Sequence, residues 1–188
     1  MLHTLKGHSA AITALAYSPD GTVLASGSGD TTARLWSSDG DARRVLAGHT
    51  FGVTSVAFSR DGKLLVTGSI DGDGRIWSVA TGRTVQRLSF HVSTVSQASF
   101  SPDGRWVVTA GPTTAAIWQV RTGALLYFLG GTTGQLLTAA FAPDSRRIVV
   151  GTGTGNIAGF DCLVCARTPA LLAQAASALR ELGPRPRG

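Results

Sequence analysis

The sequence has few charged residues, few cysteines and no long apolar run. Charged residues make up 15% of the 188 residues, whereas apolar residues make up 43%. No apolar stretch reaches the roughly 18 residues that a transmembrane helix needs, and the N-terminal stretch MLHTLKGHSA lacks the apolar core of a signal peptide. These absences predict a cytoplasmic protein with no membrane partner.

Cys162 and Cys165 are the only cysteines in the sequence. Two thiols in a chain without a secretion signal are expected to be reduced. A structural zinc ion needs about four ligands, but there is no second cysteine pair. A redox pair would stand at the start of a helix, whereas Cys162 follows a predicted strand. The sequence therefore predicts no metal site, and a packing role for both cysteines.

The charge balance is basic, but the basic residues are scattered. The net charge is +6 and the isoelectric point is about 10.3, and 15 of the 17 basic residues are arginine. Only Arg43-Arg44 and Arg146-Arg147 are adjacent, whereas nucleic-acid-binding proteins usually gather basic residues into one patch. The sequence therefore favours nucleic-acid binding less than the other functional hypotheses given below.

Glycine is abundant, with 24 residues, and it takes part in an internal repeat. The stretch GSGDTTARLW at 27–36 returns as GSIDGDGRIW at 68–77. Trp36, Trp77 and Trp118 are spaced by 41 residues each, and Phe160 follows 42 residues later. The turn sequences SPDG (18–21), SRDG (59–62), SPDG (101–104) and APDS (142–145) share this period. A fixed period of this length is the signature of a repeat protein.

Each period contains four short runs of β-forming residues, separated by turns that contain glycine or aspartate. Four short antiparallel strands in about 41 residues describe one blade of a β-propeller. We therefore predict an all-β fold over residues 1–161 with four four-stranded blades, at about 2–37, 43–78, 83–119 and 124–161.

The Gly-His, Ser-Pro-Asp-Gly, Asp and Trp landmarks resemble the WD-repeat β-propeller family over residues 2–161. In that family a His, a Ser or Thr, the Asp of a tight turn and a Trp form a hydrogen-bonded tetrad. A network of this kind fixes a turn when every member has its partner. The resemblance implies two complete tetrads and one partial tetrad: His8, Ser26, Asp30 and Trp36; His49, Thr67, Asp71 and Trp77; His91, Thr109 and Trp118.

The match to the family pattern weakens along the chain. In the third repeat the turn is one residue shorter, and Pro112 stands where the Asp belongs. In the fourth, Phe160 replaces the Trp, Thr154 takes the Asp position, and no His precedes them. We expect the first two blades to be the most rigid.

The features that resemble an enzyme site have structural explanations. His8, His49 and His91 follow the repeat spacing, which favours a structural role over metal binding or catalysis. The stretch GTGTG at 151–155 opens a strand and no Gly-Lys-Ser/Thr follows it, so it predicts a β-turn rather than a phosphate site. Four aspartates recur in the turns of the repeat, where the side chain bonds to the backbone, which favours a structural role over a catalytic one: Asp20, Asp61, Asp103 and Asp144. The sequence thus predicts no enzyme activity and no cofactor.

The resemblance implies a scaffold that binds protein partners through propeller loops. In the family, the loop that enters each first strand and the residue beside the turn Asp face the partner-binding end. Phe51 and Ile70 are the favoured contact residues, because exposed apolar side chains suit binding hot spots. The full set of matching positions is Ser9, Ala11, Gly29, Thr50, Phe51, Gly52, Ile70, Val92 and Thr94.

The composition changes after the repeats. Leu and Ala recur at helical spacing from Thr168, and Gly183-Pro184 ends the pattern. This predicts a helical cap over 162–183 and a disordered tail over 184–188. The stretch FDCLVCARTPALLAQAASALREL also resembles the C-terminal end of large bacterial multi-repeat WD proteins, many of which carry a signalling ATPase domain. The alternative hypothesis is therefore a C-terminal sensor or regulatory fragment of such an ATPase or kinase.

The two ends of the repeat region raise the question of ring closure. Residues 2–5 (LHTL) have the character of a fourth strand, whereas the last repeat ends at its third strand with Phe160. Pairing of the two would complete a ring of four blades. WD-repeat rings usually have seven blades, however, which favours an incomplete ring: either a piece of a longer propeller or one half of an eight-bladed ring made by self-association.

Overall fold

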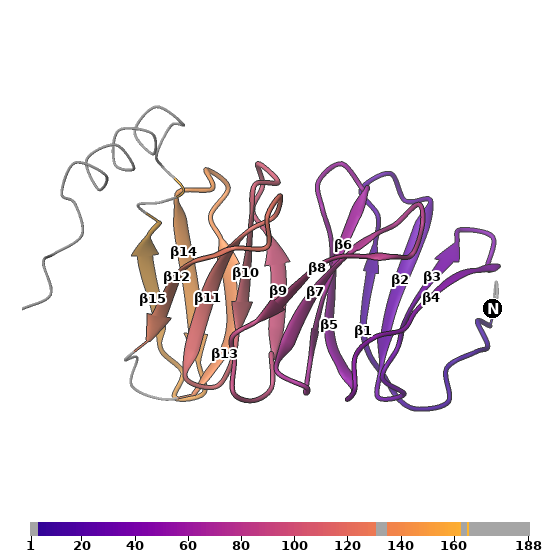
Figure 1. Cartoon of the computed structure of the whole chain (residues 1–188), viewed down its shortest axis with the longest axis horizontal. Helices are drawn as coiled ribbons and strands as arrows, with labels where there is room; N and C mark the ends of the chain where they lie inside the picture. The colour runs from indigo at the N-terminus through magenta and orange to yellow at the C-terminus, as the bar shows by residue number, and fades with distance from the viewer. Residues whose placement is uncertain (1–3, 131–134, 163–164, 166–188) are drawn as a thin grey trace, which may run out of the picture.

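The computed structural model describes residues 4–130, 135–162 and 165. Within these residues the chain forms fifteen β-strands and no helix, and the strands make four antiparallel sheets. Figure 1 shows the sheets side by side, with β1–β4 at one end of the row and β13–β15 at the other. The all-β, bladed architecture predicted from the repeat is confirmed.

Each of the first three sheets is a four-stranded blade whose strands follow one another in sequence order. Blade one contains β1 (Ile12–Tyr17), β2 (Val23–Ser28), β3 (Ala33–Ser37) and β4 (Ala42–Leu46). Blade two contains β5 (Val53–Phe58), β6 (Leu64–Ser69), β7 (Asp73–Ser78) and β8 (Thr84–Ser89). Blade three contains β9 (Gln97–Phe100), β10 (Trp106–Ala110), β11 (Thr114–Gln119) and β12 (Leu125–Gly130).

Blade four has three strands in the described residues, not the four predicted: β13 (Leu136–Phe141), β14 (Arg147–Thr152) and β15 (Ile157–Asp161). The described residues that precede β1 lie against blade one, where His8 contacts Asp30. They are at the opposite end of the row from β15 (Figure 1) and do not complete blade four. The four sheets therefore form an open row, as the incomplete-ring interpretation expects.

Tight turns between the first and second strands of each blade set the strand register. Gly21, Gly62 and Gly104 have φ values of 72°, 69° and 72° in these turns, a conformation that glycine adopts without a steric penalty. Ser145 takes the same position in blade four, with φ 59°. Its buried hydroxyl accepts a hydrogen bond from the Asp103 backbone N–H at 3.1 Å, which ties the turns of blades three and four together.

The core consists of three apolar junctions, one between each pair of neighbouring blades. We call the side that a blade turns toward the next blade its trailing face, and the side that it turns toward the previous blade its leading face. At the first junction the trailing face of blade one, with Ala25, Leu35 and Leu46, packs on the leading face of blade two, with Val53, Val56, Leu65 and Trp77. The second and third junctions repeat this arrangement.

The two cysteines correct one prediction. Cys162 and Cys165 form a disulfide, whereas reduced thiols were expected. A backbone hydrogen bond from Cys165 N–H to the Cys162 carbonyl closes a tight turn and brings the two residues together, with their Cα atoms 5.1 Å apart. The expectation rested on cellular compartment and took no account of this local geometry. Both residues also contact the apolar junction between blades three and four.

The predicted helical cap and tail, residues 162–183 and 184–188, fall outside the described residues except for Cys162 and Cys165. The part of the chain that the structure describes contains no helix with the length and apolar character needed to cross a membrane.

Candidate functional site

A continuous chain of hydrogen bonds crosses blade one. The Trp36 indole N–H donates to the Ser26 hydroxyl at 2.8 Å, and Ser26 lies 2.8 Å from His8 Nε2. His8 Nδ1 lies 2.7 Å from a carboxylate oxygen of Asp30. Because a carboxylate can only accept, Nδ1 carries the imidazole proton, and Nε2 accepts from Ser26. Every donor in the network therefore finds one acceptor.

Blade two repeats the network with a threonine in place of the serine. The Trp77 indole donates to Thr67 at 2.9 Å, Thr67 lies 2.7 Å from His49 Nε2, and His49 Nδ1 lies 2.9 Å from Asp71. Burial lowers the pKa of His49 and outweighs the opposing effect of Asp71. Burial alone would raise the pKa of Asp71, but hydrogen bonds from the Thr50 and Asp73 backbone and from His49 bring it below its usual range.

Blade three closes its network with a hydroxyl group where the first two blades use a carboxylate. Trp118 donates to Thr109 at 2.9 Å, Thr109 lies 2.8 Å from His91 Nε2, and His91 Nδ1 lies 3.1 Å from Thr114 Oγ1. Burial lowers the pKa of His91. Sequence reasoning noticed Pro112 at the Asp position but missed Thr114. The sequence does contain a signal for Thr114, because Thr32 stands at the same position of the first repeat. In the structure the Thr32 hydroxyl lies 3.5 Å from His8 Nδ1.

Blade four has an apolar pair in place of the tetrad. Val150 stands at the position of the tetrad hydroxyl, and Phe160 stands at the position of the Trp. Both belong to the apolar junction with blade three, where Val150 is fully buried. Replacing the hydroxyl and the indole together leaves no buried polar group without a partner, which makes the loss of the network tolerable.

The aspartates of the first two tetrads also fix the loops that precede the first strands. Asp30 accepts from the Ser9 backbone N–H at 3.1 Å, and Asp71 accepts from the Thr50 backbone N–H at 3.0 Å. Beside them, the Ser28 and Ser69 hydroxyls donate to loop carbonyls at 3.2 and 3.0 Å. The tetrads thus hold together the two segments that carry the predicted partner contacts. We call the surface formed by those nine residues the loop face.

Most of the loop face is exposed. Phe51, Ile70 and Val92 have exposed fractions of 60%, 52% and 100%. The prediction that Gly52 is a contact residue is corrected, because Gly52 is buried and therefore cannot contact a partner directly. A Cβ atom at Gly52 would lie 3.3 Å from Gly29 Cα and 3.4 Å from Ile70 Cδ1, so this glycine allows close packing beneath the surface. The other loop-face residues are exposed, apart from the half-buried Thr94: Ser9, Ala11, Gly29 and Thr50.

Blade two carries a pair of large apolar side chains that the neighbouring blades lack. Phe51 corresponds in the repeat to Ala10 and Ser93, and Ile70 corresponds to Gly29 and Gly111. The backbone of these loops is held in the same way in blades one and two, so folding does not require the apolar pair. Exposed apolar side chains of this size are the type found at binding hot spots.

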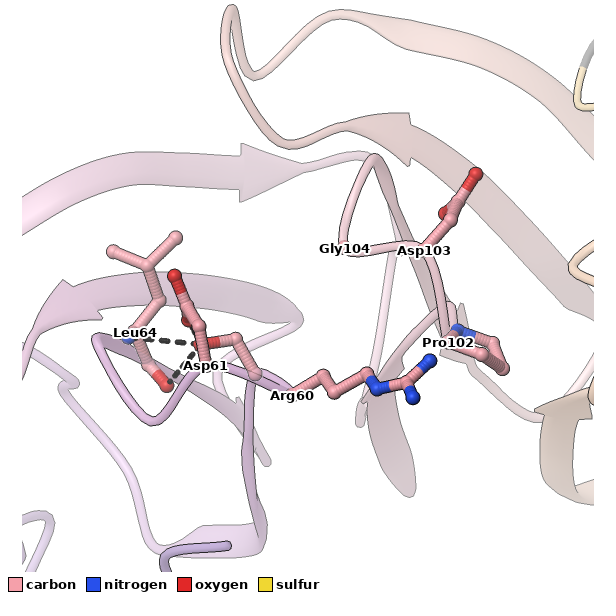
Figure 2. A pocket seen from close by; sticks show the side chains of 7 residues that line it. Arg60, Asp61, Leu64, Pro102, Asp103 and Gly104 are labelled. Carbon is pink, nitrogen blue, oxygen red and sulfur yellow. Dashed lines mark hydrogen bonds between the residues drawn. The ribbon is translucent and has the colours of Figure 1, made fainter.

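The opposite end of the blades offers a cleft of about 440 Å³ between the strand-connecting turns of blades two and three. Figure 2 shows Arg60 reaching across this cleft toward Pro102. Asp61 accepts from the Ser59 hydroxyl and the Lys63 N–H, and these bonds lower the pKa of Asp61, the Ser59 bond most. Asp103 makes the same two bonds within its own turn. Both carboxylates are therefore engaged in turn structure.

Comparisons with known proteins agree with this geometry. The sequence model of the family described as "WD domain, G-beta repeat" matches residues 1–37, 40–78 and 82–119. "Protein Mut11" of Chlamydomonas reinhardtii is 51% identical over 41 residues, which are 22% of this chain and 11% of that protein. The "Notchless protein homolog" of Arabidopsis thaliana is 61% identical over 33 residues, which are 18% of this chain and 7% of that protein. The chain thus spans only a small part of the length of these relatives.

A solved structure covers the chain more fully. The crystal structure of the computationally designed Ika4 protein superimposes with a TM-score of 0.76 at 29% sequence identity. The match covers 86% of this chain and 97% of the designed protein. The arrangement of the blades is therefore shared with a protein of known structure.

Proposed function

Because the chain belongs to the WD domain, G-beta repeat family, we propose that it is a non-catalytic scaffold that binds a protein partner through the loop face of blade two. The observation that carries this proposal is the exposed pair Phe51 and Ile70, which stands on loops whose backbone is held by Asp71 and Ser69. Apolar side chains on a pre-organised surface bind with little loss of conformational entropy.

The test is partner capture by the full chain and by two variants. The double variant Phe51→Ala, Ile70→Ala shortens the apolar pair to side chains close to those of blade one. The control double variant Val45→Ala, Val85→Ala removes comparably exposed side chains from the outer strands β4 and β8. Proteins that bind the wild type and the control, but not the loop-face variant, support the proposal, whereas equal capture by all three contradicts it. Nuclease treatment should leave capture unchanged, since the proposed partner is a protein.

The scaffold acts, in our proposal, as the C-terminal sensor or regulatory part of a larger cytoplasmic signalling ATPase or kinase of bacterial type. Two observations support this: the resemblance of the stretch after Phe160 to the ends of such proteins, and the exposed sides of the first and last blades. An ATPase or kinase domain encoded in the same reading frame or immediately upstream is the expected finding. A neighbourhood of unrelated genes, with a stop codon in frame ahead of Met1, would contradict it.

The open row of blades leads to a proposal about the state of the chain itself, namely that it associates with a second copy. An uncovered sheet face that carries apolar side chains favours association. Measurement of the mass in solution is the direct check, and a particle of 19.4 kDa at all accessible concentrations contradicts it.

A further inference from the structure

The exposed leading face of blade one has the residue pattern of a buried blade junction. Ile12, Leu15 and Tyr17 lie 41 residues before Val53, Val56 and Phe58, the first-strand residues of the leading face of blade two. Val53 and Val56 are 0% and 9% exposed against blade one. Their counterparts Ile12 and Leu15 are 49% and 64% exposed, and Tyr17 is 65% exposed.

This face also contains a groove of about 340 Å³. The side chains that line it are mostly apolar and come from the strands of blade one and from the residues before β1: Leu5, Ala10, Ile12, Leu15, Leu24 and Trp36. At the junction of blades one and two, the equivalent space is filled by the trailing face of the preceding blade. The occupant that fits the groove is therefore the trailing face of another blade.

The trailing face of blade four supplies such a surface. Val149 and Ile157 are 40% and 78% exposed. They stand 41 and 42 residues after Val108 and Ala115, which are both fully buried on the trailing face of blade three. Blade four thus keeps apolar residues at positions that a following blade covers elsewhere in the chain.

The outer strands give a second, independent complementarity. Leu5 lies three residues before His8, as Leu46 lies before His49 and Leu88 before His91. Leu46 and Leu88 are fully buried near the ends of the outer strands β4 and β8, whereas Leu5 is 36% exposed. Blade four has β15 as its last described strand and so offers an edge to an outer strand. The described residues before β1 and the edge of β15 lie at opposite ends of the row (Figure 1).

From these two complementarities, and resting on the proposed self-association, we infer that two copies of this chain join head to tail. The leading face of blade one in each copy packs on the trailing face of blade four in the other. Leu5 then takes, beside β15 of the other copy, the place that Leu46 takes beside β3 and Leu88 takes beside β7. A two-fold axis makes the two junctions equivalent and closes a ring of eight blades. Closure covers the exposed apolar face at each end of the row, which removes the surface that favours further association.

The inference is tested with two single variants and their mixture, by sedimentation velocity on the full chain. Leu15→Glu places a charge on the leading face of blade one, and Ile157→Glu places one on the trailing face of blade four. Both side chains are more than half exposed in the single chain, so each variant is expected to keep the circular dichroism spectrum of the wild type. The control Val45→Glu carries the same change on the exposed outer strand β4.

The expected results are a dimer for the wild type and the control, and dimerisation weakened roughly a hundredfold in each single variant, because every junction then buries an unpaired carboxylate. Mixing the two variants should restore a dimer, since one of the two junctions then contains neither substitution. A dimer that survives both substitutions, or variants that do not complement each other, overturns this inference but leaves self-association standing. A monomeric wild type overturns both.

Discussion

At the scale of single residues, the buried indole N–H groups of Trp36, Trp77 and Trp118 account for much of the repeat pattern. Each donates to a buried hydroxyl, and that hydroxyl is in turn held by a histidine. A buried donor without an acceptor is costly, which favours keeping or losing the Trp and the Ser or Thr together. Blade four, with Val150 and Phe160, lost both.

The first prediction compares the aromatic residue of blade one with that of blade four. Trp36→Ala should lower the free energy of unfolding by about 3–5 kcal/mol, because it removes a large buried aromatic side chain together with its hydrogen bond to Ser26. Phe160→Ala should cost less, since Phe160 is only partly buried and has no hydrogen-bond network to break. Chemical denaturation of both variants measures the difference, and equal losses would contradict the account of the tetrads.

The second prediction concerns the loss of folding stability at low pH. The pKa of His49 and of His91 is lowered from the ordinary value of 6.5 in the folded chain. As the pH falls, the unfolded chain therefore protonates these two histidines at a higher pH than the folded chain does. The free energy of unfolding should decrease as the pH drops below about 6.5. The pKa values of Asp30 and Asp71 are lowered from 3.8, so a second loss should begin as the pH nears 4.

Thermal unfolding at a series of pH values tests this prediction. A His91→Gln variant is the control, because it removes one of the two histidines whose pKa is lowered and should make the first loss shallower. An unperturbed histidine titrates between about pH 7 and about pH 5. Stability that stays flat across that range would contradict the prediction.

At the scale of elements, turns rather than strands are the most demanding positions. Gly72 and Gly155 both have positive φ, 85° and 83°, but their surroundings differ. A Cβ at Gly72 would lie 2.7 Å from the His91 backbone carbonyl oxygen, whereas a Cβ at Gly155 would meet nothing within 4 Å.

This contrast gives the third prediction. Gly155→Ala should cost about 1–2 kcal/mol, the strain of an alanine in the left-handed region. Gly72→Ala should cost more, because the loop before β9 must also move. Urea denaturation of the two variants separates the steric cost from the backbone strain. A Gly72→Ala variant that is no less stable than Gly155→Ala would contradict the prediction, because the loop before β9 would then move without measurable cost.

The strands and their pairing could be predicted from the sequence because Trp36, Trp77, Trp118 and the repeated turns mark one period. The sequence-based prediction failed where a local replacement had no place in the pattern. Thr114 took over the partner role of the missing aspartate in blade three, and a turn brought Cys162 and Cys165 within disulfide distance. The burial of Gly52 depends on the neighbouring Ile70 side chain, which a repeat alignment does not reveal.

At the scale of the whole molecule, three apolar junctions join the four blades of the described residues, and the same kinds of surface are exposed at both ends of that row. The leading face of blade one and the trailing face of blade four carry exposed apolar side chains at positions that are buried within the row. The loop face of blade two lies away from these ends, on loops fixed by Asp71 and Ser69. Partner binding and self-association therefore use different surfaces and need not compete.

In our proposal, a second copy of the chain completes the open row of four blades. Small-angle X-ray scattering from the purified full chain tests it most directly. We predict a particle of two chains of 19.4 kDa each, with a radius of gyration near the roughly 21 Å expected for a compact assembly of that many residues. A single-chain particle that stays elongated and does not change with concentration would contradict the claim.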